Sequence, residues 1–211
     1  MRHHLMSKKN TIGAKVLVGF SLMELIVAVG IFTLISTVVL TSQSSFNSSV
    51  LLGSLAYDIG LSVREAQVFG LSVRGTGEGG ADRSDFEIGY GIYMSNTSPD
   101  SYVLFADTYP ANNPDRKYTP GEDLAVRNYS LGKGHRISSF CGIATGGQEY
   151  CSPVISHINI VFMRPNPDAN ITSNEIGHGQ YSSARIVVSS AGGLTREVEI
   201  SSTGQISVKN P

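Results

Sequence analysis

The sequence predicts an α+β protein, in which a long N-terminal helix is followed by a domain built on an antiparallel β-sheet. Three observations predict this fold class: an apolar run from Val16 to Leu40, a helical stripe of apolar residues after it, and alternating apolar and polar residues beyond a glycine-rich break. Because proline is absent before Pro99, one uninterrupted helix can extend from about Ser21 to Ser72.

The first half of the predicted helix is long and apolar enough to cross a membrane. Phe20 to Leu40 comprises 21 residues, which at 1.5 Å per residue is about 31 Å of helix. Glu24 is its one ionisable residue, and a charge in the hydrocarbon core costs roughly 2.5–3.5 kcal/mol. Glu24 therefore either lies at headgroup level or needs a partner charge. The polar residues Thr41–Ser49 continue this helix or melt locally, so the membrane segment with its polar continuation covers residues 20–49.

The residues before the membrane segment are basic. Met1 to Gly19 holds Arg2, Lys8, Lys9 and Lys15 and no acidic residue. Such a flank stays in the cytoplasm, so the domain after the helix is predicted to lie outside the cytoplasmic membrane of a single-pass protein. An ordinary secretory signal, cut after the apolar run, has the same general pattern.

The stretch GFSLMELIVAVGIF, which begins at Gly19, resembles the class III signal of type IV prepilins and type II secretion pseudopilins. The resemblance implies that prepilin peptidase removes the leader, residues 1–19, and methylates the new terminal amine of Phe20. It also implies a pilin-like fold and assembly with other pilin or pseudopilin subunits into a periplasmic or extracellular filament. Glu24 matches the family glutamate that pairs with the terminus of a neighbouring subunit. A free amine is largely cationic at neutral pH, so it is the partner charge that Glu24 needs.

The second half of the predicted helix carries an apolar stripe that should pack against the sheet of a globular domain, residues 50–211. The stripe consists of Leu52, Leu55, Ile59, Val63, Ala66, Phe69 and Val73. A glycine-rich break, Arg74 to Ser84, follows.

Period-two alternation predicts eight strands after the break, joined into an antiparallel sheet. They are Phe86–Met94, Ser101–Ala106, Leu124–Ser130, His135–Cys141, His157–Met163, Ala184–Ser190, Leu194–Ser201 and Gln205–Val208. The apolar and glycine pattern of this region loosely resembles the H-type minor pseudopilins. Some DNA-binding relatives carry arginines in the closing strand, whereas this chain has Gly204, Gln205, Ile206 and Ser207 there.

Two cysteines, Cys141 and Cys151, are predicted to form a disulfide, because the domain lies outside the cytoplasm. The alternative is a pair of buried free thiols. A metal site at these cysteines is disfavoured, because two cysteines and scattered histidines do not make a ligand set.

One loop is rich in the oxygen donors that suit Ca²⁺. The candidate ligands are Asp107, Asp115, Glu122 and Asp123, with Asn112 and Asn113 between them. Their spacing is not that of an EF-hand, and Asn, Asp and Pro also form ordinary turns, so a plain surface loop is the alternative.

The remaining features favour a structural protein. His135, His157 and His178 are scattered, and neither a Gly-x-Ser-x-Gly nor a His-Glu-x-x-His motif occurs, so an enzyme is not expected. Without its basic leader the chain is net acidic, which argues against binding of nucleic acid. The predicted function is a structural, minor subunit of a type IV pilus-like or type II secretion filament. The alternatives are a DNA-binding or adhesive minor subunit of the same machinery, or an unrelated single-span protein with an extracellular β-rich domain.

Overall fold

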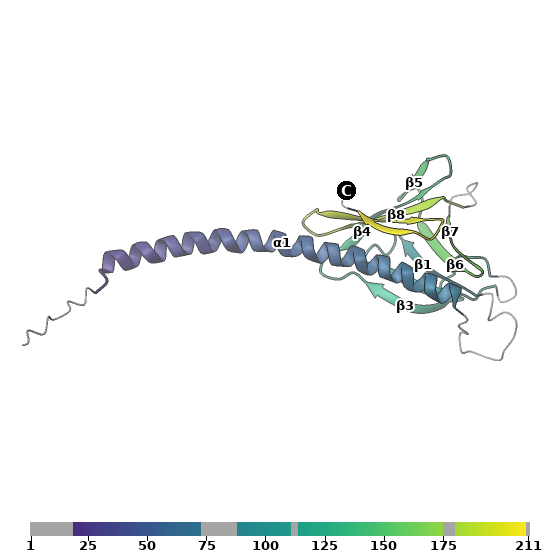
Figure 1. Ribbon diagram of the computed structural model, residues 1–211, viewed down its shortest axis with the longest axis horizontal. Coiled ribbons are helices and arrows are strands. Elements are labelled where there is room, and N and C mark those ends of the chain that lie inside the picture. The colour runs from purple at the N-terminus through teal and green to yellow at the C-terminus, as the bar shows by residue number, and fades with distance from the viewer. Residues whose placement is uncertain (1–18, 73–87, 111–113, 175–179, 210–211) are drawn as a thin grey trace, which may run out of the picture. The chain divides into compact units, whose positions relative to one another are not determined.

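The computed structural model describes residues 19–72, 88–110, 114–174 and 180–209 (Figure 1). The chain divides into two compact units, Met1–Gln43 and Ser44–Pro211. The N-terminal part of helix α1 belongs to the first unit, and the rest of α1 with all strands belongs to the second. The predicted leader, except for Gly19, and the glycine-rich break lie outside the described residues.

Helix α1 comprises Leu22–Leu71, one residue shorter at each end than the prediction. Its start is capped by Ser21, whose Oγ accepts a hydrogen bond from the Met23 N–H at 3.2 Å. Near its end, the absence of a side chain at Gly70 allows close approach to strand β6 (His157–Met163), because an added Cβ would lie 2.2 Å from the Phe162 carbonyl oxygen. A glycine inside a helix is costly, and this contact explains why one is used here.

The second half of α1 packs against the strands along the predicted stripe. Within this half, five side chains belong to the core cluster shared with the strands: Leu52, Ala56, Ile59, Val63 and Ala66. Leu55 and Phe69 are partly buried against the same cluster, whereas Val73 lies outside the described residues. Steps of three and four residues placed these side chains on one face, as expected from 3.6 residues per turn.

In the described residues, the strands form two antiparallel sheets of five strands each (Figure 1). The first sheet has the order β3-β2-β1-β6-β7, with bounds Leu124–Ser130, Ser101–Asp107, Gly89–Ser95, His157–Met163 and Asn166–Ser173. The second has the order β10-β9-β8-β4-β5, with bounds Ile206–Lys209, Thr195–Ser201, Ser183–Ser189, Arg136–Ile143 and Glu149–Cys151. The α+β class is therefore confirmed, but the expectation of a single sheet is wrong. A strongly twisted open sheet of about ten strands tends to split into two packed sheets.

Two strands were not predicted. Strand β5 has only three residues and pairs with β4 alone. Strand β7 reads NPDANITS, in which Asn, Asp and Pro are poor strand formers. It is an edge strand of the first sheet, and an edge tolerates Pro167 because the proline has no N–H to donate.

The side chain of Gln67 joins the two sheets at the C-terminal end of α1. Its Nε2 donates to the carbonyl of Pro167 in β7 at 3.1 Å and to the carbonyl of Gly204, in the β9–β10 turn, at 3.3 Å. Gly204 has φ +80°, and an added Cβ would lie 2.4 Å from the Pro167 oxygen. Glycine is therefore required at 204 by both conformation and space.

Candidate functional site

The predicted cut site lies in exposed, non-helical chain just before α1. Gly19 and Phe20 precede the helix, and Phe20 is 83% exposed. Apart from its chain neighbours, no described residue has a heavy atom within 4 Å of a Cβ placed on Gly19. Glu24 is in the first turn of the helix and is exposed in the single chain. A carboxylate there is favoured by the positive end of the helix dipole.

The apolar part of α1 has the length and composition of a membrane span. Leu22–Leu40, 19 residues, meets this criterion, and none of it is buried inside the protein. The hydroxyl of Thr33 donates to the carbonyls of Val29 and Gly30, and that of Thr37 donates to the carbonyl of Thr33. These internal bonds satisfy polar groups that would be unsolvated in lipid.

The second half of α1 has an exposed apolar stripe on the side away from the core. It consists of Val50, Tyr57, Leu61 and Val68, each more than half exposed. Their spacing of seven, four and seven residues places them on one helix face. We refer to these four residues as the outer stripe. Sequence reasoning followed the buried stripe and missed this one, although the same periodicity contains it.

The two cysteines are joined by a disulfide, as predicted. Cys141 in β4 lies directly opposite Cys151 in β5, so the bond links neighbouring strands. Glu149 lies close to both sulfur atoms, but disulfide sulfurs are not thiolate metal ligands. The bond closes a short hairpin, and a loop of this size corresponds to about 2–3 kcal/mol in the chain-entropy model.

In the acidic loop, Asp123 holds three backbone N–H groups. Its Oδ1 accepts hydrogen bonds from Thr108 and Tyr109, both at 2.8 Å, and its Oδ2 accepts one from Thr119 at 2.6 Å. Asp123 is buried. This carboxylate therefore fixes both ends of the loop that follows β2, a role that the count of oxygen donors did not suggest.

Asp107, at the end of β2, is fully buried beneath the same loop. Its Oδ2 accepts a hydrogen bond from the Arg116 N–H at 2.7 Å, and its Oδ1 has no hydrogen-bond partner among the described residues. Burial raises the pKa of Asp107 to about 7, the Arg116 N–H opposes this, and the charges of Asp123 and Asp115 add to it.

The structure does not place the four candidate calcium ligands alike. Asp107 and Asp123 are buried, whereas Asp115 and Glu122 are exposed. Asp115 accepts a hydrogen bond from the Lys117 N–H at 3.0 Å. Within the described part of the chain, no three of these four carboxylates are close enough to form a metal-ligand group. Asn112 and Asn113 lie outside the described residues. Calcium binding stays a prediction.

The loop also packs against the face of the first sheet turned away from α1. The ring of Tyr118 contacts Phe105 and Tyr93, with centroids 5.0 and 4.9 Å apart. The Tyr118 N–H donates to Oδ1 of buried Asn159 in β6 at 3.0 Å. These contacts order the loop around Tyr118. They could not be predicted from the sequence, because Tyr93, Phe105 and Asn159 lie on neighbouring strands although they are up to 66 positions apart in the chain.

Of the described residues, neither His135 nor His157 belongs to a group that could hold a metal ion. His135 is buried in the turn before β4, and His157 begins β6, where burial, and then the charge of Lys117, lowers its pKa. Nδ1 of His157 lies 3.2 Å from Oγ of Ser156. His178 lies outside the described residues. In the closing hairpin, Gln205, Ile206 and Ser207 follow Gly204, so that β10 carries no arginine.

Comparison with protein-family models, with curated proteins and with solved structures gives no match to this chain.

Proposed function

We propose that this chain is a structural, minor subunit of a type IV pilus-like or type II secretion pseudopilus filament. Prepilin peptidase cuts it between Gly19 and Phe20 and methylates the Phe20 amine. The helix anchors the subunit in the cytoplasmic membrane, with the globular domain outside, until it joins a periplasmic or extracellular filament. The resemblance to class III signals is the starting point of this proposal.

One observation carries the proposal. The Gly-Phe-Ser-Leu-Met-Glu motif lies where exposed, non-helical chain meets the start of a 50-residue helix. A peptidase needs extended, accessible chain at the bond that it cuts. The cut would leave Phe20 as a new N-terminus one helical turn before Glu24, at the end of an apolar segment.

The outer stripe supports assembly through α1. A membrane span needs about 20 residues, but exposed apolar residues recur on this helix from Val50 to Val68, beyond Leu40 where the membrane-length segment ends. Exposed apolar residues that share one helix face indicate a contact surface rather than scattered surface side chains. Packing of α1 against other subunits would bury both the span and the outer stripe.

Glu24 then acts as a docking check. Burial in a helix bundle penalises an unpaired carboxylate, and a neighbour in register supplies the terminal cation that removes the penalty. Before the cut, Phe20 is an amide, so the cation is absent and the uncut precursor cannot satisfy Glu24 of its neighbour.

The test is mass spectrometry of the N-terminal peptide from membrane-extracted protein, produced with and without prepilin peptidase. With the peptidase we expect a chain that begins at methylated Phe20. Gly19→Val should block the cut, and Gly13→Val, a matched change elsewhere in the leader, should not. A mature chain that begins at Met1, or after Ser36 or Ser42, would exclude the proposed function.

A further inference from the structure

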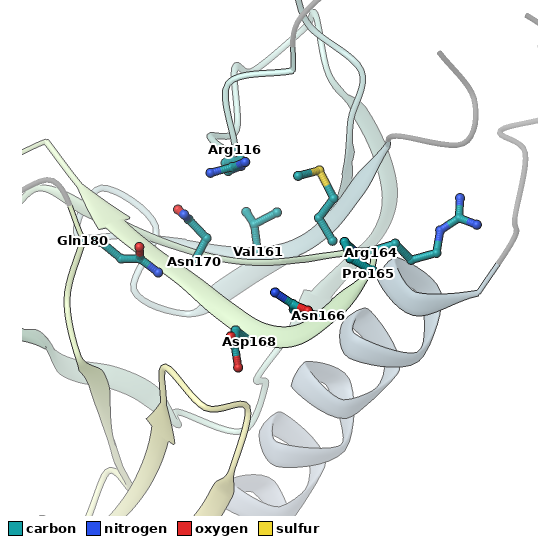
Figure 2. Close-up of a pocket in the computed structure, with 9 residues that line it drawn as sticks. Arg116, Val161, Arg164, Pro165, Asn166, Asp168, Asn170 and Gln180 are labelled. Carbon is teal, nitrogen blue, oxygen red and sulfur yellow. The ribbon is translucent and has the colours of Figure 1, made fainter. Parts of the chain in front are cut away.

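A pocket of about 350 Å³ lies on the face of the first sheet turned away from α1, next to the β6–β7 turn. Val161 and Asn170, neighbours across β6 and β7, form its floor. In the same two strands, the residues that alternate with them, such as Ile160 and Ile171, belong to the core cluster. We refer to this cavity as the Arg116 pocket, since Arg116 lies over the floor (Figure 2).

Arg116 is held in an unfavourable backbone conformation. Its φ is +62°, in the left-handed region that costs a residue with a Cβ about 1 kcal/mol or more. The buried carboxylate of Asp107 fixes it through the 2.7 Å hydrogen bond to the Arg116 N–H. The protein therefore uses a buried acid to hold the backbone from which the Arg116 side chain extends. Strain of this kind is concentrated at sites that bind something.

The charge of Arg116 is available to a ligand. The side chain is exposed, and the three ion pairs among the described residues involve other groups. Figure 2 shows the side chain of Asn170 directed toward Arg116, whereas those of Asp168 and Arg164 extend away from it. The lining thus holds two arginines and one acid, and Arg116 is the arginine that lies over the floor.

The other walls fit the groups around a carboxylate. The amides of Asn166, Asn170 and Gln180 line the pocket, together with the apolar side chains of Met163 and Pro165. Amide N–H groups donate to an anion, and the apolar walls can contact the carbon chain beside it. A pocket of this volume is at the small end of ligand sites and holds one or two amino-acid residues.

We infer that the Arg116 pocket binds a carboxylate group. The guanidinium fork of Arg116 pairs with both carboxylate oxygens, and the Asn170 amide provides a further donor, as does the second N–H of Gln180, whose Nε2 already donates to the Ala169 carbonyl at 3.2 Å. Arg116, Arg164 and Asp168 together give the lining one net positive charge, which balances one carboxylate, whereas a phosphate dianion carries nearly two negative charges. The carboxylate belongs to the C-terminus of a peptide or to an acidic side chain. This inference does not depend on the proposed filament.

Calorimetric titration of the full chain in detergent, at neutral pH, tests the inference. The probes are N-acetyl-alanyl-alanine, the same peptide as its C-terminal amide, and the α-amide of N-acetyl-glutamate, which has only a side-chain carboxylate. If N-acetyl-alanyl-alanine binds and the glutamate probe does not, the pocket recognises a peptide C-terminus. If both carboxylate probes bind, the pocket recognises a carboxylate from either source. Either result supports the inference if the neutral amide does not bind.

Arg116→Asn is the informative variant, because Asn accepts the left-handed conformation and removes the charge. We expect it to weaken binding by at least about tenfold, and Arg116→Lys to retain part of the binding. Lys117→Gln is the matched control, since it removes the same charge one residue away and should leave binding unchanged. Equal binding of the neutral amide, no binding of either carboxylate at about 10 mM, or unchanged binding by Arg116→Asn would overturn the inference.

Discussion

If α1 assembles through the outer stripe, as proposed, substitutions on its two faces should separate stability from assembly. Ile59 is fully buried in the core cluster, whereas Leu61, two positions along the helix, is 65% exposed in the outer stripe. Ile59→Ala removes three carbon atoms from a packed site, which costs about 2–5 kcal/mol. With a urea dependence of about 1.5–2 kcal/mol per molar for a domain of this size, the unfolding midpoint should fall by roughly 1–3 M. Leu61→Gln replaces one good helix former by another in solvent, so it should change stability by less than about 0.5 kcal/mol.

Assembly should respond in the opposite way. Burial of one leucine in a helix–helix contact contributes on the order of 1.5–2 kcal/mol, so Leu61→Gln should weaken association of subunits by roughly tenfold or more. The assay pairs urea unfolding of the full chain in detergent, followed by the near-ultraviolet signal of its tyrosines, with co-purification of the other filament subunits. If Leu61→Gln lowers the midpoint as much as Ile59→Ala does, or leaves co-purification at the wild-type level, the assignment of the outer stripe is wrong.

Four further outcomes are expected. Glu24→Gln should insert into the membrane at least as well as the wild type but co-purify poorly with other subunits, because the neighbour's terminal cation loses its partner; wild-type co-purification would exclude the docking role. Non-reducing peptide mapping of exported protein should yield one linked peptide pair containing Cys141 and Cys151, and two alkylatable thiols would contradict this. Burial raises the pKa of Asp107 to about 7, above its value in the unfolded chain, so the native state binds the Asp107 proton more tightly than the unfolded state does. The protonated side chain therefore contributes its full stabilisation below about pH 4, and this stabilisation is lost as the pH rises through about 7. The loss should be about 2 kcal/mol, since the nearby solvent screens part of the effect, and Asp107→Asn should make urea midpoints at pH 4.5 and 7.5 more alike. If the acidic loop binds calcium, millimolar Ca²⁺ should raise the melting temperature above that in chelator, and no shift together with no calorimetric binding would leave a turn-rich loop without a calcium site.

The helix and the disulfide could be predicted because each depends on local information. A stripe with steps of three and four residues specifies a helix wherever it lies, and α1 begins and ends within one residue of the prediction. Strands β3 and β6 were predicted with their observed bounds, Leu124–Ser130 and His157–Met163, because they alternate or are continuously apolar between turn residues. The disulfide required only a compartment and a pair of cysteines.

The division into two sheets depends on which strands pair, and pairing is not local. Strand β6 lies beside β1, and β8 lies beside β4, so in both sheets strands distant in the chain become neighbours. Strand β7 is the clearest case. Its residues resemble a turn, and only the edge of the first sheet, offered by β6, makes them a strand. The strand propensity of its residues therefore did not predict β7, because pairing with the exposed edge of β6 determines its structure.

The acidic loop shows the same limit at the level of a site. Oxygen donors in the sequence suggested a cation, but a count of carboxylates omits the backbone N–H groups that they face. Asp123 meets three such groups and Asp107 meets one, so both carboxylates already have an electrostatic role in the fold. Asp107 accepts its hydrogen bond from the backbone N–H of Arg116. It therefore fixes the backbone from which this cationic side chain extends. The acids of the loop are thus connected to the chemistry of the pocket through the backbone, and a change at Asp107 should alter carboxylate binding without touching the pocket wall.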